Sequence, residues 1–242
     1  MDRIACSNLW MRFGGFAALR GIDLSLPAGQ YAILVGLNGA GKSTLLKALG
    51  GWIRPSDGAV AIDGLAFERA ERRLRARVKL VPDTPAFYPE LTAWEHLQVV
   101  AQAHGLERWQ SEAERLLSAF SMAPHQGAYP ASLSRGMQYK LALAMSLLAA
   151  PSALLLDEPY GALDPASQLY LAERLTLLAR AGATVLASTH LLPPTHPPDR
   201  ILMLMAGTLQ RDALLDEVWS GSAEGLAALP HQLLVSGSAV DA

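Results

Sequence analysis

Residues 36–44 read Gly-Leu-Asn-Gly-Ala-Gly-Lys-Ser-Thr, and this stretch limits the possible folds more than any other part of the chain. It fits the pattern G-x-x-x-x-G-K-[ST] at every fixed position. An apolar run at 31–35 precedes it and a helix-forming run at 45–49 follows, which predicts a strand, a tight turn and a helix. Because glycines let a backbone wrap around a phosphate with its N–H groups pointing inward, we expect a phosphate-binding loop.

Two side chains of this loop have expected roles. Lys42 is predicted to reach the β- and γ-phosphates of a nucleotide, and the Ser43 hydroxyl to ligate Mg²⁺. The helix that begins near Gly41 adds the positive end of its dipole. The alternative is a glycine-rich turn that binds nothing, and the flanking strand and helix argue against it.

The bulk properties indicate the class of protein. The 242 residues, 51% hydrophobic and 17% charged, are enough for a globular chain with one good core. A net charge of -2 gives no electrostatic reason to expect nucleic acid as a partner. Cys6 is the single cysteine, which fits a reducing compartment. No apolar run reaches the ~18 residues that a transmembrane helix requires, so we expect a soluble chain that meets a membrane only through a partner.

The pattern along the chain changes in four sections. Residues 1–30 and 51–82 carry the alternation and turns of short strands, 83–150 is mainly helical, and 151–212 returns to strands separated by a helix. Three helix starts are predicted by N-cap residues, namely Thr92 with Glu95, Ser134, and Asp164 followed by proline. Ser134 also marks a potential anion site, although most such caps bind nothing.

Two buried strands are predicted to end in polar residues. The apolar run 153–156 ends in Asp157 and Glu158, and the run 184–188 leads to His190. Ligands sit at the carboxyl ends of strands in open α/β sheets, and adjacent buried carboxylates are costly unless they meet a cation. We expect Asp157 to hold Mg²⁺, directly or through water, and Glu158 to orient or deprotonate an attacking water. A lone histidine is more often structural, but this position favours a functional His190.

Taken in order, these motifs resemble those of the ATP-binding-cassette (ABC) ATPase subunits. The phosphate loop, Leu-Ser-x-Gly at 133–136, Leu-Leu-Leu-Asp-Glu-Pro at 154–159, Gly-Ala-Leu-Asp at 161–164 and Ser-Thr-His at 188–190 look like the Walker A, signature, Walker B, D-loop and H-loop elements. The resemblance implies an α/β fold, a P-loop NTPase core with a mainly parallel central sheet, an antiparallel β subdomain and an inserted helical subdomain. The implied divisions of this single ABC ATPase domain, 1–242, are a core (1–82 and 151–212), a helical subdomain (83–150) and a C-terminal extension (213–242).

The resemblance also implies roles for single residues. Phe13 would stack on adenine. Asp157 would be the Walker B carboxylate, Glu158 the catalytic base and His190 the γ-phosphate switch, with Lys42 catalytic as well as binding. The residues that cradle the phosphates of ATP and Mg²⁺ would be Gly36, Asn38, Gly39, Gly41, Lys42, Ser43 and Thr44.

Other implied roles involve partners. Ser134 and Gly136 would act in trans, closing over the nucleotide of a second subunit in a head-to-tail homodimer or heterodimer. The helical subdomain would press on a transmembrane permease subunit, which would place the protein in the cytoplasm, peripheral on the inner face of the cell membrane. No nucleic acid is expected.

Several positions depart from the family pattern. Asp83 stands where glutamine is usual, a position that would contact nucleotide and Mg²⁺, and Arg135 and Met137 replace a glycine and the glutamine of the signature. An acidic residue at that position and a Leu-Ser-x-Gly-Met signature are similar to some bacterial export-type (ABC-2) subunits, which favours export.

Three functions follow as hypotheses. The first is an ATP-hydrolysing subunit that energises substrate movement through a transmembrane partner. The second is a soluble ABC-type ATPase acting on a ribosome or a nucleic-acid machine, which this chain's single cassette and lack of sustained heptads disfavour. The third is a regulatory cassette, motivated by Asp83 and Arg135 and opposed by the intact Glu158 and His190.

Overall fold

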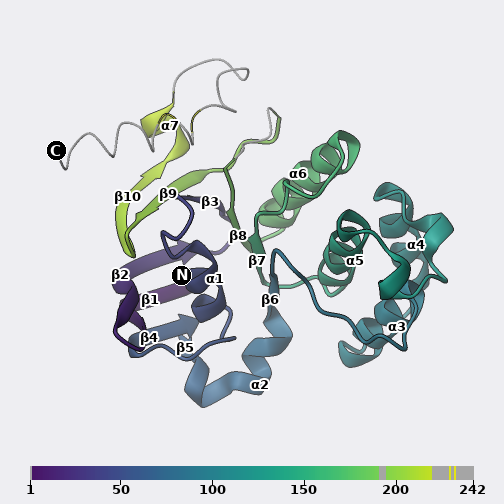
Figure 1. The fold of residues 1–242 in the computed structure, drawn as a ribbon, viewed down its shortest axis with the longest axis horizontal. Coiled ribbons are helices and arrows are strands. Elements are labelled where there is room, and N and C mark those ends of the chain that lie inside the picture. The colour runs from purple at the N-terminus through teal and green to yellow at the C-terminus, as the bar shows by residue number, and fades with distance from the viewer. Residues whose placement is uncertain (1, 191–194, 220–228, 230–231, 233–242) are drawn as a thin grey trace.

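The computed structural model describes residues 2–190, 195–219, 229 and 232, and its elements form two β-sheets and a group of helices (Figure 1). The first sheet is antiparallel in the order β2-β1-β4-β5, with β1 (Asp2–Phe13), β2 (Phe16–Pro27), β4 (Asp57–Ile62) and β5 (Leu65–Ala66). The prediction of short strands in the first thirty residues was wrong, because β1 and β2 each run for twelve residues. Irregularities of register along this pair interrupt the apolar alternation that would have revealed their length.

The second sheet has the order β10-β9-β3-β8-β7-β6. Its strands are β3 (Tyr31–Val35), β6 (Val78–Val81), β7 (Ala153–Asp157), β8 (Thr184–Ser188), β9 (Arg200–Met205) and β10 (Thr208–Leu214). All neighbours are parallel except β10, which pairs antiparallel with β9. The mainly parallel central sheet is therefore confirmed, and its antiparallel edge strand β10 was not predicted from the sequence.

The helices carry the predicted caps. They are α1 (Lys42–Leu49), α2 (Phe67–Arg77), α3 (Ala93–Ala103), α4 (Gln110–Ala119), α5 (Arg135–Leu148), α6 (Pro165–Arg180) and α7 (Leu215–Val218), with short 3-10 turns at Ala123–His125 and Pro130–Ser132. Thr92 and Glu95 form both hydrogen bonds of a capping box, and the Ser134 and Asp164 side chains cap α5 and α6. In the part of the chain described, no helix is long and apolar enough to cross a bilayer.

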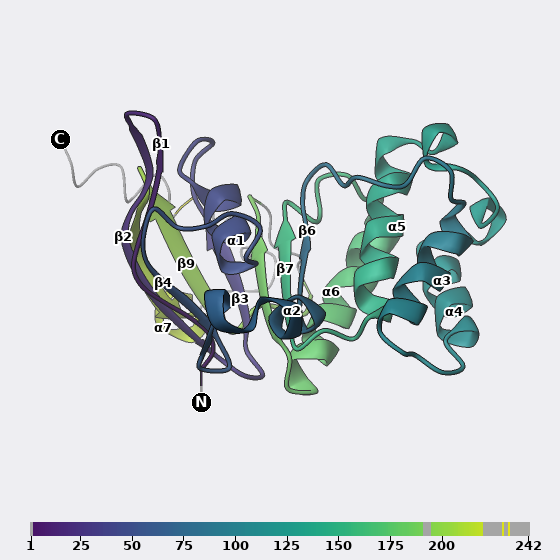
Figure 2. The same cartoon turned by 90° about the horizontal axis from the view of Figure 1, so that it is seen from below.

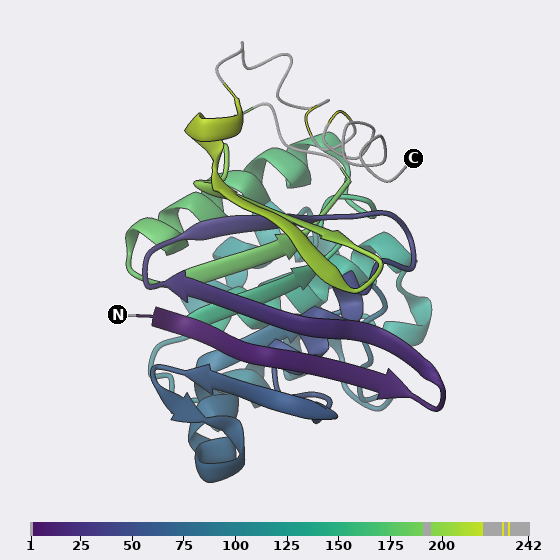
Figure 3. The same cartoon turned by 90° about the vertical axis from the view of Figure 1, so that its left-hand side faces the viewer.

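The helix after the phosphate loop lies between the two sheets. In Figure 2, α1 is flanked by β1 and β2 on one side and by β7 on the other, and Figure 3 faces the antiparallel sheet with β10 beside it. Residues of β3 alternate between two cores: Ala32 and Leu34 pack with α1 and the antiparallel sheet, whereas Ile33 packs with the helices of the opposite face. This two-sided burial explains why β3 is apolar throughout, and it fixes the loop that follows.

A buried tyrosine pair joins β3 to the segment after β7. The hydroxyls of Tyr31 and Tyr160 lie 2.9 Å apart, and both side chains are buried. Burial raises the pKa of Tyr31 from 10.0 to about 12, against a smaller lowering by the Tyr160 hydrogen bond. The fold therefore favours the neutral phenol.

This raised pKa predicts weaker folding at alkaline pH. Stability from Tyr31 is complete below pH 10, where the phenol is neutral in both states, and falls between pH 10 and 12 as only the unfolded chain ionises. We expect the titration of Tyr31 to lower the free energy of unfolding by about 1 kcal/mol from pH 9 to 11, measured by urea unfolding. The Tyr31→Phe variant is expected to show a smaller fall over this range. An equal fall in both proteins would contradict the assignment.

Candidate active site

A cavity of about 380 Å³ opens over the phosphate loop at the carboxyl ends of β3 and β7. The predicted residues that line it are Phe13, Asn38, Gly39, Gly41, Lys42, Ser43, Thr44, Asp83, Asp157 and Glu158. Phe16, Ala18 and Leu37 also line it, and no sequence motif predicted a role for them in the site. The chain thus brings ten predicted residues, from four separate segments, to one place.

Gly41 and Gly36 of the loop are required for different steric reasons. Gly41, the N-cap of α1, has φ 108°, and a Cβ there would lie 2.7 Å from the carbonyl oxygen of Ala18. Gly36 does not line the cavity, and a Cβ there would lie 2.4 Å from the carbonyl oxygen of Leu204 on β9. Packing against the neighbouring strand is therefore sufficient reason for glycine at 36.

A cation, a carboxylate and an imidazole meet beside the loop. Lys42, only 7% exposed, donates from Nζ to the carbonyl oxygen of Gly36 at 2.8 Å. The same Nζ lies 3.6 Å from Glu158 Oε1 and 3.3 Å from His190 Nε2, and His190 Nε2 lies 3.1 Å from Glu158 Oε1. The sequence predictions for Lys42, Glu158 and His190 therefore converge on one cluster, in which a positive charge adjoins a potential proton acceptor.

Hydrogen bonds from β8 and α5 hold the two carboxylate residues. Ser188 Oγ donates to Asp157 Oδ1 at 2.7 Å, and the backbone N–H of Glu158 donates to Ser188 Oγ at 3.0 Å. Glu158 has φ 49°, a left-handed conformation that a non-glycine residue keeps only where its surroundings impose it. Ser188 was missed, although it stands two residues before His190 and is the register partner of Asp157.

Tyr139 on α5 was also missed. Its hydroxyl donates to the carbonyl oxygen of Asp157 at 3.0 Å. Burial, followed by the negative charges of Asp157, Asp83 and Glu158, raises the pKa of Tyr139 well above its ordinary value. The hydroxyl therefore stays a donor at neutral pH, and it ties α5 to the end of β7.

The residues of the cavity fit Mg²⁺. The Ser43 hydroxyl and the carboxylates of Asp157 and Asp83 line the same cavity, and Mg²⁺ binds oxygen ligands while keeping waters and substrate phosphate oxygens. The described residues contain no cluster of three or more His, Cys, Asp or Glu side chains that could hold a metal by themselves. This donor set suits an ion that arrives with a nucleotide.

Two aromatic side chains stand at the mouth of the cavity. Phe13 is 53% exposed and Phe16 is 60% exposed, and they face each other across the β1–β2 turn. An exposed aromatic face is suited to stacking on a purine ring. The two-residue Gly14-Gly15 turn was the signal that Phe16 would lie opposite Phe13.

The N-terminus of α5 lies outside this cavity. Ser134 and Gly136 are not among its lining residues, and Ser134 Oγ accepts a hydrogen bond from the N–H of Met137 at 3.3 Å. A Cβ at Gly136 would lie 2.7 Å from the carbonyl oxygen of Ala162, so close packing against the loop before α6 requires glycine here. Neither Ser134 nor Gly136 therefore contributes to the lining of the cavity in its own chain.

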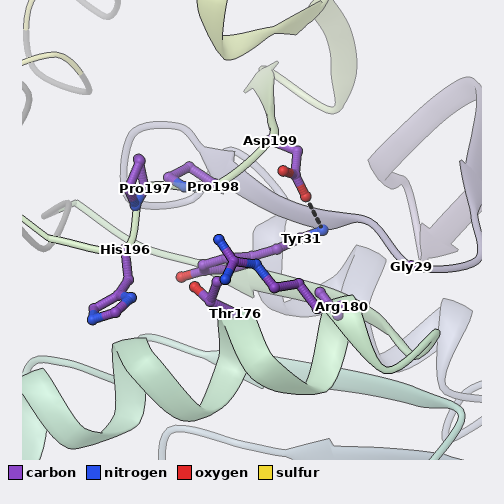
Figure 4. Close-up of a pocket in the computed structure, with 9 residues that line it drawn as sticks. Gly29, Tyr31, Thr176, Arg180, His196, Pro197, Pro198 and Asp199 are labelled. Carbon is purple, nitrogen blue, oxygen red and sulfur yellow. Dashed lines mark hydrogen bonds between the residues drawn. The ribbon is translucent and has the colours of Figure 1, made fainter.

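A second cavity, of about 370 Å³, lies at the opposite edge of the sheet (Figure 4). Tyr31 at the start of β3, Arg180 at the end of α6 and the 196–199 segment line it. Asp199 accepts a hydrogen bond from the Tyr31 backbone N–H at 2.8 Å. Because it adjoins the amino ends of the strands and the C-terminus of a helix, this cavity lacks the features of a phosphate site.

Comparison with known proteins decides the family. A family profile described as ABC transporter matches residues 19–161. The chain belongs to the ABC transporter family. The ABC-type transporter ATP-binding protein EcsA of Bacillus subtilis (strain 168) is 34% identical over 211 residues, which cover 85% of each chain. The aliphatic sulfonates import ATP-binding protein SsuB of Pseudomonas entomophila (strain L48) is 34% identical, over 88% of this chain and 77% of that one.

A solved structure, described as that of an ATP binding subunit of an ABC transporter, has a TM-score of 0.84 and 29% identity, covering 94% of this chain and 99% of the other. The α/β ABC ATPase fold, with its antiparallel β subdomain and helical region, is thereby confirmed. The chain is the ATP-binding subunit of an ABC transporter, an ATPase that energises transport.

Proposed function

We propose that the cavity binds ATP with Mg²⁺ and that Lys42, Glu158 and His190 carry out hydrolysis. The observation that supports this most directly is the meeting of their side chains within 3.6 Å of one another beside the phosphate loop. Phosphoryl transfer depends mainly on positioning and on stabilising developing charge, which this cluster supplies.

Each side chain has one proposed task. Glu158 orients the attacking water and takes its proton, and its fixed backbone aims the carboxylate. Lys42 exchanges its bonds to loop carbonyls for the β- and γ-phosphates, while His190, already against Glu158, contacts the γ-phosphate. When bound, Mg²⁺ neutralises phosphate charge, and Ser43, Asp157 and Asp83 would hold it. Phe13 stacks on adenine.

The remaining phosphate contacts come from the loop backbone. The residues proposed for them are Asn38, Gly39, Gly41, Ser43 and Thr44, which line the cavity, whereas Gly36 lies outside the lining and is proposed to help through its carbonyl oxygen, which holds Lys42. Successive N–H groups of such a loop, at the start of α1, form an anion site.

We propose that the active unit is a head-to-tail dimer, either of identical or of related subunits. Ser134 and Gly136 stand at an exposed helix N-terminus that does not serve the cavity of its own chain. Ser134 and Gly136 therefore close over the nucleotide of the second subunit, and two ATP molecules lie at the interface.

We further propose that the subunit acts in the cytoplasm, peripheral on the inner membrane face through a transmembrane permease subunit that contacts the helical subdomain (83–150). The core comprises 1–82 and 151–212, and the extension 213–242 begins within β10, with 220–228, 230–231 and 233–242 outside the described residues. Asp83 and the Leu-Ser-Arg-Gly-Met signature favour an export-type transporter, whereas the SsuB relatives are named importers. Direct measurement of transport in vesicles would give the direction.

Purification of the tagged full chain from its own host in mild detergent tests the proposed partner. We expect an integral membrane protein at a stoichiometric amount, identified by mass spectrometry. Ribosomal proteins or DNA at comparable amounts would instead support the soluble-machine alternative and overturn the transport partner.

A further inference from the structure

The two residues that depart most from the family pattern contact each other. Arg135 Nη2 lies 2.9 Å from Asp83 Oδ1 and 2.8 Å from Asp83 Oδ2. Asp83 follows β6 and lines the nucleotide cavity, whereas Arg135 is the first residue of α5. One ion pair therefore joins the cavity to the helix whose N-terminus carries Ser134 and Gly136.

This ion pair is not needed to hold α5 in place. Other contacts already anchor the helix, since the buried Tyr139 hydroxyl donates to the end of β7 and the part-buried Gln138 Nε2 donates to the carbonyl oxygen of Pro130 at 2.9 Å. The side chains of Arg135 and Asp83 are 67% and 48% exposed. Exposed pairs of this kind contribute little to stability, so the separation of Arg135 from Asp83 costs little free energy.

Arg135 stands between the two residues that meet the second subunit's nucleotide in the proposed dimer. A guanidinium donates charge-assisted hydrogen bonds to phosphate oxygens as well as to a carboxylate, and a nucleoside triphosphate offers more negative charge than one aspartate. The N-terminus of α5 adds its dipole to the same position. A phosphate that approaches from a second subunit would therefore compete with Asp83 for Arg135.

We propose that Arg135 is a phosphate-binding residue that acts in trans, and that Asp83 holds it within its own subunit until the partner's ATP arrives. The inference rests on the proposed head-to-tail dimer. Arg135 leaves the carboxylate for the phosphates of the partner's nucleotide as the dimer closes. Asp83 is then released beside the nucleotide of its own cavity. Closure thus depends on a competition between one carboxylate and one nucleotide for the same guanidinium.

The test uses the full chain with Glu158→Gln, in which hydrolysis is expected to be about 100-fold slower or more, so that ATP persists during the measurement. ATP-dependent dimerisation with Mg²⁺ is measured by analytical ultracentrifugation, with ADP as the control nucleotide. Arg135→Gln is expected to weaken the dimer about tenfold or more, because a charge-assisted bond to phosphate is lost. Once any loss of nucleotide and Mg²⁺ binding in its own cavity is corrected for, Asp83→Asn is expected to strengthen the dimer about two- to fivefold, because Arg135 is released.

If Arg135→Gln weakens the dimer and Asp83→Asn strengthens it, the two residues compete as proposed. If the ion pair were only structural, its loss would weaken dimerisation in both variants. Arg135→Lys, which keeps the charge, is expected to recover part of the loss. The affinity of each variant for a fluorescent ATP analogue is measured at protein concentrations too low for dimers to form. This measurement gives any effect of Asp83→Asn on its own cavity, which is then subtracted from the change in dimerisation. Equal weakening by both variants, or no effect of Arg135→Gln, would overturn the proposal.

The Ser134→Ala variant shows whether a negative result contradicts the role of Arg135 or the proposed dimer itself. If Ser134→Ala weakens dimerisation and Arg135→Gln does not, the dimer is supported and the role of Arg135 is wrong. If the Glu158→Gln protein does not dimerise with ATP at all, the proposed dimer itself fails, and with it the inference.

Discussion

Replacing Glu158 by glutamine is expected to lower ATP turnover by about 100-fold or more, since a positioned general base contributes roughly 10²–10⁴-fold to such reactions. Glutamine keeps the size of the side chain and its hydrogen bond toward His190 but cannot accept the proton of water. ATP binding should persist, because the phosphate loop and Lys42 are unchanged. Steady-state phosphate release and equilibrium binding of ATP measure the two effects separately.

Glu114→Gln is a matched control for this variant. Glu114 is an exposed residue of α4, outside the cavity, so its substitution removes the same charge without touching the site. Turnover near the wild-type rate is expected for Glu114→Gln, and ATP-dependent dimers should accumulate only in Glu158→Gln. Normal turnover in the Glu158→Gln protein would show that another group is the base.

Replacing Lys42 by alanine is expected to weaken ATP binding itself by about 10- to 100-fold, the equivalent of a lost hydrogen bond to a charged group of roughly 1.5–3 kcal/mol. The ammonium is buried at the cavity floor and has no substitute there among the described lining residues. The change also leaves Glu158 without its nearby cation. Titration with a fluorescent ATP analogue measures the loss.

Lys47→Ala provides the comparison for Lys42, because it removes a lysine from the same helix without altering the cavity lining. Melting temperatures of both variants show whether either loss of affinity reflects unfolding. If ATP affinity in Lys42→Ala equals that of Lys47→Ala, the proposed cradle is wrong.

Local chemistry made much of the site predictable from the sequence. A strand, a glycine-rich turn and a helix leave few conformations for 31–49. Polar residues at the ends of apolar runs indicate that the carboxyl ends of these strands form a ligand-binding edge of the sheet. Parallel pairing then brings Asp157 beside Ser188, which carries Glu158 toward His190 and Lys42. Residues that belong to short-range sequence patterns therefore lie together as predicted, and their roles stay predictions.

Contacts between distant segments were not predictable in this way. The Asp83–Arg135 pair joins residues 52 positions apart, and each residue by itself reads only as a departure from a pattern. The strand β10 was missed because it is mostly exposed, so apolar periodicity gives little signal for it. Phe16 and Tyr139 were missed because a turn and a helix face, rather than a motif, bring them to the site.

The position of α1 between the two sheets has a consequence for engineering and for domain evolution. Leu45, Leu46 and Leu49 of α1 share one core with Ile4, Leu9 and Ile22 of the antiparallel sheet. The matched family segment begins at residue 19, within β2, and so cuts through this core. A minimal fragment cut at that boundary would expose the helix that supports the phosphate loop. The antiparallel sheet is thus packed as part of the nucleotide-binding unit, and an exchange between homologues would have to keep the α1 side chains matched to it.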